Sequence, residues 1–362
     1  MSIINVCIVG CGRISTLNAL GYVGHPDARI YAVCDINESQ ARSRAVEWQA
    51  EVVYTDYRDV LKDPNIHAVE LLVPHHLHAS MTVQACKAGK HVSVQKPMAL
   101  SLEEADLMIS AAKEAGVKLK VYENFVCYPP YVKAKQLIDA GEIGEPISIR
   151  IKSNAGKKGM GWHIDASTWA WRMKEEESGG GPLVFDDGYH KFSVAMYLLG
   201  DVEKVNAWID RTETVPGISW QDAPAMIMWK YRDAKKYGMM DIMSSPDLTI
   251  ATNYYGIDER VEVTGTRGVL WVTRCTAKMM QIPALMVYKD GKMETYNHLR
   301  DDWADSFVDS TKDFIEAIKQ DREPMLSGER GREVLRFALA AIESSKRNKE
   351  VHLDELESGK TM

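Results

Sequence analysis

The chain has 362 residues, of which 45% are hydrophobic and 26% charged, as is usual for a folded globular protein. This length exceeds what one hydrophobic core usually supports, so we expect two domains. Lys and Arg number 44 and Asp and Glu 51, which gives a net charge of −7. Because no Lys/Arg-rich block stands out, neither nucleic acid nor an anionic membrane surface is an expected partner.

The N-terminal residues lead directly into a strand-like run, without the basic stretch and apolar core of a signal peptide. No apolar segment approaches the ~20 residues that a membrane helix needs. We therefore expect a cytoplasmic protein. The six cysteines form no Cys-x-x-Cys motif, which favours reduced structural thiols. They are Cys7, Cys11, Cys34, Cys86, Cys127 and Cys275.

The first third of the chain alternates short apolar runs with helical periodicity. Successive residues of the runs are apolar, which indicates a parallel sheet covered by helices on both faces. This alternation predicts an α/β Rossmann domain with a doubly wound parallel sheet over residues 1–122. Gly89 and Gly116 follow helices, as C-cap glycines do. The expected strands are 5–9, 30–34, 52–54, 68–73, 91–94 and 118–122, and the clearest helices are 38–48, 78–87 and 102–115.

After residue 145 strands follow one another with few helices between them. This pattern predicts an α+β domain with an open, mostly antiparallel sheet over residues 123–362. We expect the sheet to carry the substrate site and to provide a face through which homo-oligomers form, dimeric or larger. The C-terminal helices can pack back on the first domain. The long irregular stretch 154–182 is expected to be functional or mobile. The expected strands are 146–153, 204–210, 225–231, 237–243, 260–264 and 269–273, with a hairpin turn at 266–268 and helices at 306–319 and 331–346.

A glycine-rich motif, Gly10-Cys11-Gly12-Arg13-Ile14-Ser15, follows the first strand and opens a helix. The first glycine permits a tight turn, the second lets the backbone approach a pyrophosphate, and the helix N-terminus offers amide donors. Ser15 stands where Gly or Ala is usual, so the helix is expected to pack slightly wider. Asp35 ends the second strand, where a carboxylate binds the adenosine ribose and repels a 2′-phosphate, which favours NAD over NADP. A structural turn with a surface Asp is the alternative.

Two further groups have the chemistry of a dehydrogenase site. Lys96 lies past the fifth strand, at the sheet edge where ligands bind, and Pro97 restricts its backbone. Taken alone, a solvated loop Lys is the commoner interpretation. Asp186 and His190 are four residues apart after a glycine run, which on a helix puts both on one face. A His beside a carboxylate is a natural proton acceptor; a capping Asp and a buried structural His are the alternative.

The sequence His75-His76-Leu77-His78 raises the question of a metal site. No Cys or carboxylate nearby completes a ligand set, and the segment ends a strand that faces the nucleotide. We therefore expect a cofactor contact or a helix start there, and no metal.

Jointly, the motifs resemble those of the Gfo/Idh/MocA oxidoreductases over nearly the whole chain. The matching features are the glycine motif, Pro74 with His78, Ala-Gly-Lys-His-Val ahead of Lys96-Pro97, Gly-Gly-Gly ahead of Asp-x-Gly-x-His, and the segments 262–268, 313–314, 323–324 and 327–329. The resemblance implies NAD(P)-dependent oxidation of a CH–OH group. It also implies that His190 abstracts the hydroxyl proton, Lys96 holds the same oxygen and the nicotinamide ribose, and Asp186 anchors substrate or orients the His. The implied cofactor contacts are Gly10, Gly12, Arg13, Ile14, Asp35, Pro74, His75, His78, Gln95, Lys96 and Asn124.

Two positions depart from the family pattern. Gln95 replaces the usual Glu, which removes the charge that would pair with Lys96, and Val126 stands where Arg is common. Because an Arg clamp for a carboxylate or phosphate is missing, a neutral polyol substrate is expected.

Tryptophans in the irregular stretch are the expected sugar-binding surfaces, because indole faces pack on the C–H faces of pyranose rings; a role in the core or in an oligomer contact is the alternative. The expected substrate contacts are Trp162, Trp169, Trp171, Arg172 and Asp186, with His163 and Asp165 as further hydroxyl partners.

Within the family, this site is similar to that of glucoside 3-dehydrogenases, including those that begin the deglycosylation of plant C-glucosides. The resemblance predicts NAD-dependent oxidation of a secondary hydroxyl, at C3, of a sugar or glycoside. An inositol or free-sugar dehydrogenase is the alternative enzyme. A non-catalytic NAD-binding sensor is the alternative of another class, against which Lys96 and His190 argue.

Overall fold

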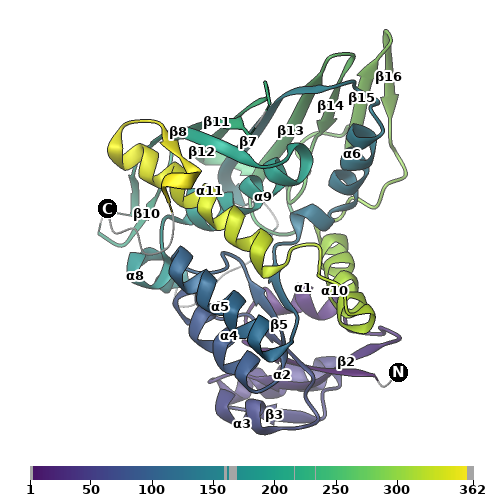
Figure 1. Ribbon diagram of the computed structural model, residues 1–362, viewed down its shortest axis with the longest axis vertical. Helices are drawn as coiled ribbons and strands as arrows, with labels where there is room; N and C mark the ends of the chain where they lie inside the picture. The colour runs from purple at the N-terminus through teal and green to yellow at the C-terminus, as the bar shows by residue number, and fades with distance from the viewer. Residues whose placement is uncertain (1–2, 159–160, 163–168, 216, 233, 357–362) are drawn as a thin grey trace. The chain divides into compact units, whose positions relative to one another are not determined.

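The computed structural model describes residues 3–158, 161–162, 169–215, 217–232 and 234–356. The chain divides into two compact units (Figure 1). The N-terminal unit comprises Met1–Asn124 and Phe307–Leu335, and the C-terminal unit comprises Phe125–Ser306 and Arg336–Met362. Helix α11 (Gly328–Arg347) therefore contributes to both units.

A six-stranded parallel sheet with the order β3-β2-β1-β4-β5-β6 forms the centre of the N-terminal unit. The strand order reverses between β1 and β4, and in open α/β sheets such a reversal marks the ligand crevice. The strands are β1 (Ile4–Val9), β2 (Ala28–Cys34), β3 (Val52–Tyr54), β4 (Ala68–Leu71), β5 (His91–Gln95) and β6 (Leu119–Tyr122).

Helices cover this sheet. Helices α4 (His78–Lys87) and α5 (Leu102–Ala115) lie side by side (Figure 1). Phe314 and Ile315 of α10 (Trp303–Gln320) join the buried side chains of β1 and β2 in one hydrophobic core. The other helices of this unit are α1 (Ser15–Leu20), α2 (Glu38–Trp48) and α3 (Tyr57–Lys62). The predicted Rossmann fold is confirmed, with the predicted bounds of α2, α4 and α5.

A nine-stranded mixed sheet with the order β16-β15-β14-β13-β7-β12-β11-β8-β17 forms the C-terminal unit, and only the β7–β12 pair is parallel among its described strands. The predicted open, mostly antiparallel sheet is thus confirmed. The strands are β7 (Pro146–Lys158), β8 (Val202–Ile209), β11 (Ala225–Tyr231), β12 (Tyr237–Ile250), β13 (Ile257–Gly265), β14 (Gly268–Val272), β15 (Leu285–Lys289), β16 (Lys292–Thr295) and β17 (Val351–His352). A separate hairpin pairs β9 (Thr212–Val215) with β10 (Ser219–Gln221).

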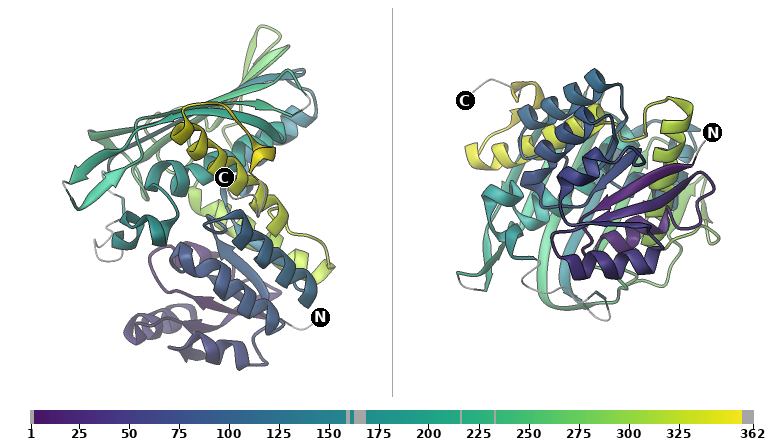
Figure 2. Two further views of the ribbon diagram at one scale, coloured as in Figure 1. Left: turned by 60° about the vertical axis from the view of Figure 1, so that its left-hand side comes forward. Right: turned by 90° about the horizontal axis from the view of Figure 1, so that it is seen from below.

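The two faces of the nine-stranded sheet differ. Helices α6 (Pro129–Asp139) and α9 (Gly188–Leu199) contact it on one side, whereas Figure 2 shows no helix of the described residues on the other. Alternation along β11 follows this asymmetry, because Ile227 and Trp229 are buried while Met228 between them is exposed. Such alternation is expected for a strand that has one face covered and the other open.

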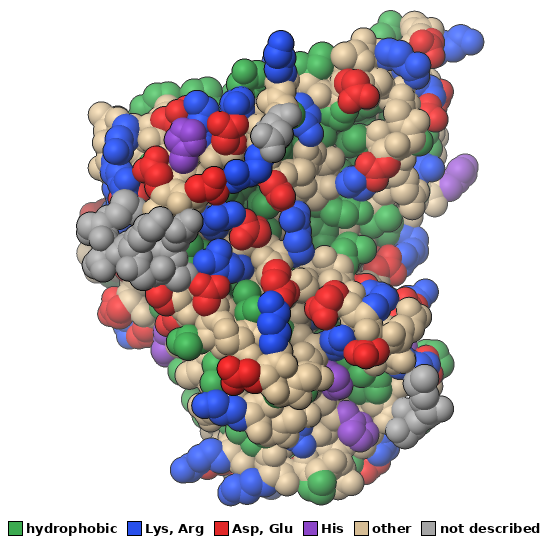
Figure 3. All heavy atoms as spheres, in the orientation of Figure 1, with side chains coloured by type: hydrophobic (Ala, Val, Ile, Leu, Met, Phe, Trp, Pro, Cys, Tyr) green, Lys and Arg blue, Asp and Glu red, His purple; other side chains and the backbone are tan. Residues whose placement is uncertain are grey.

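Charges on the visible face are mixed: Figure 3 shows Lys and Arg interspersed with Asp and Glu. All six cysteines are free and buried. None of the described helices combines the length and apolar character needed to cross a bilayer.

Candidate active site

The glycine motif forms a tight turn between β1 and α1. Gly10 has a φ of +94°, and a Cβ there would lie 2.2 Å from the carbonyl oxygen of Leu72, so only glycine fits. A Cβ at Gly12 would meet no protein atom within 4 Å, so that side of the turn is open. Ser15 is buried, and its hydroxyl donates to the carbonyl of Gly12 at 2.6 Å. Ser15 thus closes the turn through a hydrogen bond.

Asp35, directly after β2, joins the glycine turn to helix α2. Its Oδ2 accepts a hydrogen bond from the amide of Cys11 at 2.7 Å, and its Oδ1 accepts one from the amide of Asn37 at 2.8 Å. Ile36 beside it is almost fully exposed. The carboxylate therefore lies at the carboxyl end of β2, where a ribose-binding group is needed.

A buried carboxylate of the central sheet holds helix α1 in position. Glu70 on β4 accepts hydrogen bonds from the side chains of Asn18 and Tyr22. Burial raises the pKa of Glu70, an effect that the nearby Lys120 ammonium opposes. This network ties the helix after the glycine turn to the centre of the sheet.

The segments after β4 and β5 meet at His78. One ring nitrogen of His78 lies 2.8 Å from the carbonyl oxygen of Pro97 and the other 2.9 Å from that of Val73. The side-chain oxygen of Gln95 accepts a hydrogen bond from the amide of Lys96 at 2.8 Å, and the peptide between Lys96 and Pro97 is cis. The backbone that carries Lys96 is therefore held on both sides.

Asp186 in the C-terminal unit has a basic partner. It is buried in a π-helical turn, η4 (Pro182–Asp187), and its Oδ2 lies 2.8 Å from Nε of Arg172. The guanidinium carbon of Arg172 lies 4.2 Å from the ring centroids of both Trp169 and Trp171. Two indole rings and one carboxylate thus surround this cation, an arrangement that suits the planar guanidinium.

His190, buried near the start of α9, stacks on Phe125. The ring centroids are 4.0 Å apart and the planes differ by 11°. Phe125 packs edge-on against Trp303, and Trp303 contacts Tyr255, which contacts Trp169. Trp162 is packed in the same aromatic cluster against Tyr254, Tyr255 and Trp303. Aromatic contacts therefore link the surroundings of His190 to those of Arg172.

A buried ion cluster lies beside His190. Nζ of Lys191 is 2.6 Å from both Asp187 and Glu259, and it lies 5.1 Å from the centroid of the Phe125 ring. Burial alone would lower the pKa of Lys191, but the two carboxylates outweigh it and hold that pKa above its ordinary value. The cluster attaches helix α9 to strand β13 through Glu259.

Sequence comparisons cover most of the chain. Residues 4–123 match the oxidoreductase family with the NAD-binding Rossmann fold, and residues 135–353 match the C-terminal alpha/beta domain of the same Gfo/Idh/MocA family. The chain belongs to this family. It is therefore an oxidoreductase, as its sequence motifs predicted.

Three similar proteins illustrate the range of the Gfo/Idh/MocA family. An uncharacterized oxidoreductase of Bacillus subtilis is 30% identical over 93% of each chain. Myo-inositol 2-dehydrogenase of Thermotoga maritima is 27% identical over 96% of this chain and 98% of that one. The structure of levoglucosan dehydrogenase in complex with NADH and levoglucosan has a TM-score of 0.83, at 22% identity over 97% of this chain and 100% of that one, and shows the shared fold.

The N-terminal unit of this family member fits NAD. The constrained turn at Gly10, the open side at Gly12 and the carboxylate at Asp35 form the cradle that a dinucleotide requires. The cofactor residues that the sequence predicted in residues 10–35 thus occur together, as do those at 74–78 and 95–96, which His78 connects.

The structure gives a different picture for the residues predicted to bind substrate than for those predicted to bind the cofactor. Trp162, Trp169, Trp171, Arg172 and Asp186 lie in the described C-terminal unit, but the tryptophans contact Arg172 or other aromatic rings. His163 and Asp165 are outside the described residues. Sequence reasoning missed Phe125, Lys191 with Glu259, and Asp222, a buried carboxylate that accepts hydrogen bonds from the start of η4. The glycine run before η4 was the available signal of a close approach there.

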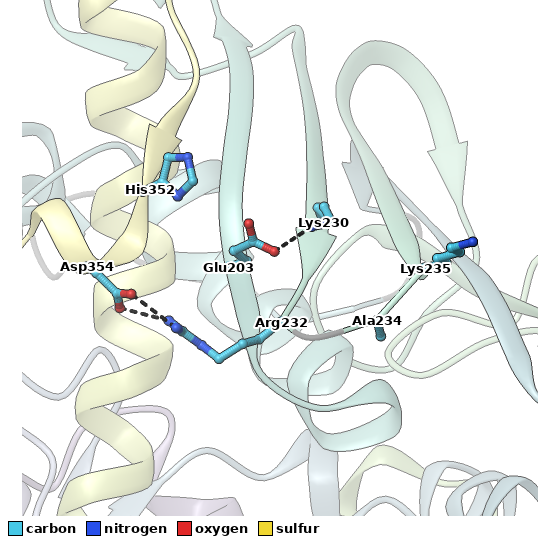
Figure 4. Close-up of a pocket in the computed structure, with 7 residues that line it drawn as sticks. All are labelled: Glu203, Lys230, Arg232, Ala234, Lys235, His352 and Asp354. Carbon is cyan, nitrogen blue, oxygen red and sulfur yellow. Dashed lines mark hydrogen bonds and ion pairs between the residues drawn. The ribbon is translucent and has the colours of Figure 1, made fainter.

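One pocket lies apart from these residues, along β8, β11 and the C-terminal segment (Figure 4). Four of its charged side chains form two pairs: Lys230 with Glu203 at 2.6 Å, and Arg232 with both oxygens of Asp354 at 3.0 and 2.7 Å. Among the described residues, no cluster of His, Cys, Asp and Glu has the arrangement of a metal site. We assign no catalytic role to the pocket.

Proposed function

We propose that this oxidoreductase uses NAD to oxidise a secondary hydroxyl, at C3, of a neutral sugar or glycoside. The observation that carries the proposal is the Arg172–Asp186 pair, whose guanidinium carbon lies 4.2 Å from the ring centroids of Trp169 and Trp171. Arg172 is the cation in the substrate segment best suited to clamp a carboxylate, and Asp186 already neutralises it. A neutral ligand rich in hydroxyls suits such a surface better than an anion.

The proposed chemistry divides between the cofactor and four side chains. NAD, when bound, accepts the hydride. His190 takes the hydroxyl proton, since a neutral imidazole is a good base near neutral pH. Lys96 stabilises the negative charge that develops on the same oxygen, and Asp186, with Arg172, binds neighbouring hydroxyls. The products are a ketone, reduced cofactor and one proton.

The similarity to myo-inositol 2-dehydrogenase and to levoglucosan dehydrogenase supports a polyol or anhydrosugar substrate class for this chain. An inositol dehydrogenase is the second candidate. Both candidates share the requirement for a ring that bears neighbouring hydroxyls, and they differ from a non-catalytic NAD sensor, which would bind NAD without reducing it.

We also propose a homo-oligomer built on the open face of the nine-stranded sheet. That face presents Met, Trp and Tyr side chains, the residue types that are enriched where proteins meet. They include Trp208, Met228, Tyr237, Tyr288 and Met293.

The test is an assay of NADH formation with NAD and a panel of ring substrates: a glucoside, the matching glucuronide, free glucose, levoglucosan and myo-inositol. We expect the highest kcat/KM for a neutral ring, and a lower value for the glucuronide than for the glucoside. Lys96→Met is the matched control, because it keeps the side-chain length and removes the cation. A preference for the glucuronide would contradict the neutral-substrate proposal, and NAD binding without NADH formation on any ring would favour the sensor.

A further inference from the structure

We propose that Asp222 is a positioning residue: its carboxylate, bound to the backbone at the start of the segment 182–199, sets where Asp186 and His190 stand. The proposal rests on the functions proposed above for those two residues. Asp222 lies between β10 and β11, some 30 residues along the chain from the residues that it would position. It therefore acts from outside the helical segment.

Both carboxylate oxygens of Asp222 contact the start of η4. Oδ1 accepts a hydrogen bond from the amide of Leu183 at 2.7 Å, and Oδ2 accepts one from the amide of Val184 at 2.8 Å. The first amides of a helix have no partner within the helix, and a negative charge is favourable at that end. One carboxylate thus satisfies two buried donors at once, which fixes the first turn in position and direction.

The turn held in this way carries Asp186. The amide of Asp186 donates to the carbonyl of Gly181 at 3.1 Å, which closes the wide π-helical turn before α9 begins at Gly188. Single π-helical turns are uncommon and occur frequently at functional sites. Because the segment is continuous from Pro182 to Leu199, a shift at its first turn moves His190 as well.

The glycine run is shaped around the carboxylate. A Cβ built at Gly181 would lie 2.0 Å from Cγ of Asp222, and its three nearest atoms all belong to that carboxyl group. Yet Gly181 has a φ of −76° and a ψ of 157°, which any residue adopts. Glycine is needed at this position because Asp222 approaches the backbone, and the turn dihedrals do not require it.

The hairpin that supplies Asp222 also contacts the other half of the Arg172–Asp186 pair. Nε1 of Trp220 on β10 donates to the carbonyl of Met173 at 3.2 Å, and Met173 directly follows Arg172. The β9–β10 hairpin thus holds both chain segments whose side chains meet at 2.8 Å. A local change in the hairpin should move these two groups relative to each other.

Four variants test the proposal: Asp222→Ala, Asp222→Asn, Gly181→Ala and the double variant Gly181→Ala/Asp222→Ala. We expect Asp222→Ala to lower kcat by roughly 10- to 100-fold, because a displacement of about 1 Å at a catalytic group has effects of that order. NAD affinity, measured by titration, should not change.

Asp222→Asn keeps one acceptor and should retain more activity than Asp222→Ala. In the double variant the clash is relieved, so its thermal stability should exceed that of Gly181→Ala while kcat stays low.

A readout that needs no substrate is the NMR signal of the His190 ring, assigned by its loss in His190→Ala. Stacking on Phe125 shifts the ring protons upfield, and Asp222→Ala should reduce that shift. Asp313→Asn is the matched control, because Asp313 also accepts a backbone amide, that of Met325 at 2.7 Å, but in the N-terminal unit. It should leave the His190 signal and kcat unchanged.

The proposal would be overturned if Asp222→Ala or the double variant had the kcat of the wild type and a His190 signal at the same position as in the wild type. If Asp222→Ala does not fold, Asp222→Asn decides the question by the same two readouts. If the wild-type protein oxidises no polyol, the proposed function fails, while the NMR comparison still tests the positioning by Asp222.

Discussion

His190 and Asp186 each have a partner that limits their motion. Phe125 stacks on the imidazole face of His190, and Arg172 holds one oxygen of Asp186. Stacking fixes the plane of the imidazole ring without using the nitrogen lone pair, which lies in that plane. A ring held in this manner can accept a proton without a large reorientation, and this is what a general base requires.

We predict that His190→Ala lowers kcat by roughly 10²- to 10⁴-fold, the usual range for loss of a general base, while NAD affinity stays the same. Phe125→Leu should have a smaller effect on kcat, because the base is present but its plane is no longer fixed. Steady-state rates and NAD titration of both variants check this. Equal losses of NAD affinity and kcat in His190→Ala would place His190 in the cofactor site instead.

We predict that Asp35→Ser weakens NAD and relatively favours NADP, because both the ribose acceptor and its repulsive charge are lost. Asp35 also accepts hydrogen bonds from the amides of Cys11 and Asn37, so part of the loss in NAD affinity would come from a looser turn. Asp35→Asn separates the two contributions, since it keeps an acceptor and removes the charge. Titration of each variant with both cofactors measures the preference. An unchanged NAD affinity in Asp35→Ser would show that the carboxylate does not reach the ribose.

At the scale of secondary-structure elements, buried charges hold the helical segment 182–199 in place. Lys191 pairs with Asp187 and Glu259 at 2.6 Å, and Asp222 caps the start of the segment. Buried ion pairs contribute little net stability compared with apolar side chains, but breaking one leaves an uncompensated charge. These contacts lie at the start of η4 and at the start of α9, an arrangement better suited to fixing the position of the segment than to stabilising the fold.

We predict that Asp222 makes stability pH-dependent. Burial raises its pKa from 3.8 to about 6, so the stability that it contributes is fully present below pH 3.8 and is lost as the pH rises through 6. This difference in pKa corresponds to about 3 kcal/mol. Asn does not titrate, so Asp222→Asn should not show this loss. The free energy of unfolding of Asp222→Asn minus that of the wild type should therefore rise by about 3 kcal/mol from about pH 4 to pH 7. Urea denaturation at several pH values measures it, and parallel stability curves would contradict it.

The predicted elements agree with the structure where local sequence determines them. The strands and glycine turns of the first 122 residues were predicted within a few residues, because doubly buried strands and C-cap glycines such as Gly116 are local signals. Strands β15 and β16 were missed. The contacts of Phe125 and Asp222 were missed because their partners lie 65 and about 40 residues away, and no periodicity encodes such contacts. Substrate binding by the tryptophans stays a prediction, and the contacts of Trp169 and Trp171 with Arg172 were missed.

For the whole molecule, the open face of the nine-stranded sheet is the feature that the fold of the single chain does not explain. Its charged side chains pair across neighbouring strands: Lys152 lies 2.5 Å from Asp258, and Arg150 lies 3.5 Å from Glu262. Trp271 donates to Glu262 at 2.7 Å. Charges already paired within the sheet can be covered by another protein surface with a smaller desolvation cost than isolated charges.

We predict that the protein is a dimer formed through this face. Light scattering coupled to size exclusion should give twice the chain mass of 40.7 kDa. Met228 is 41% exposed at the middle of β11, and Met228→Asp would place an unpaired charge in the covered face, so this variant should dissociate toward the monomer. Val46→Asp is the control, because Val46 is 82% exposed on α2, in the N-terminal unit. A monomeric wild type, or a Met228→Asp variant with unchanged mass, would show that the open face has another use.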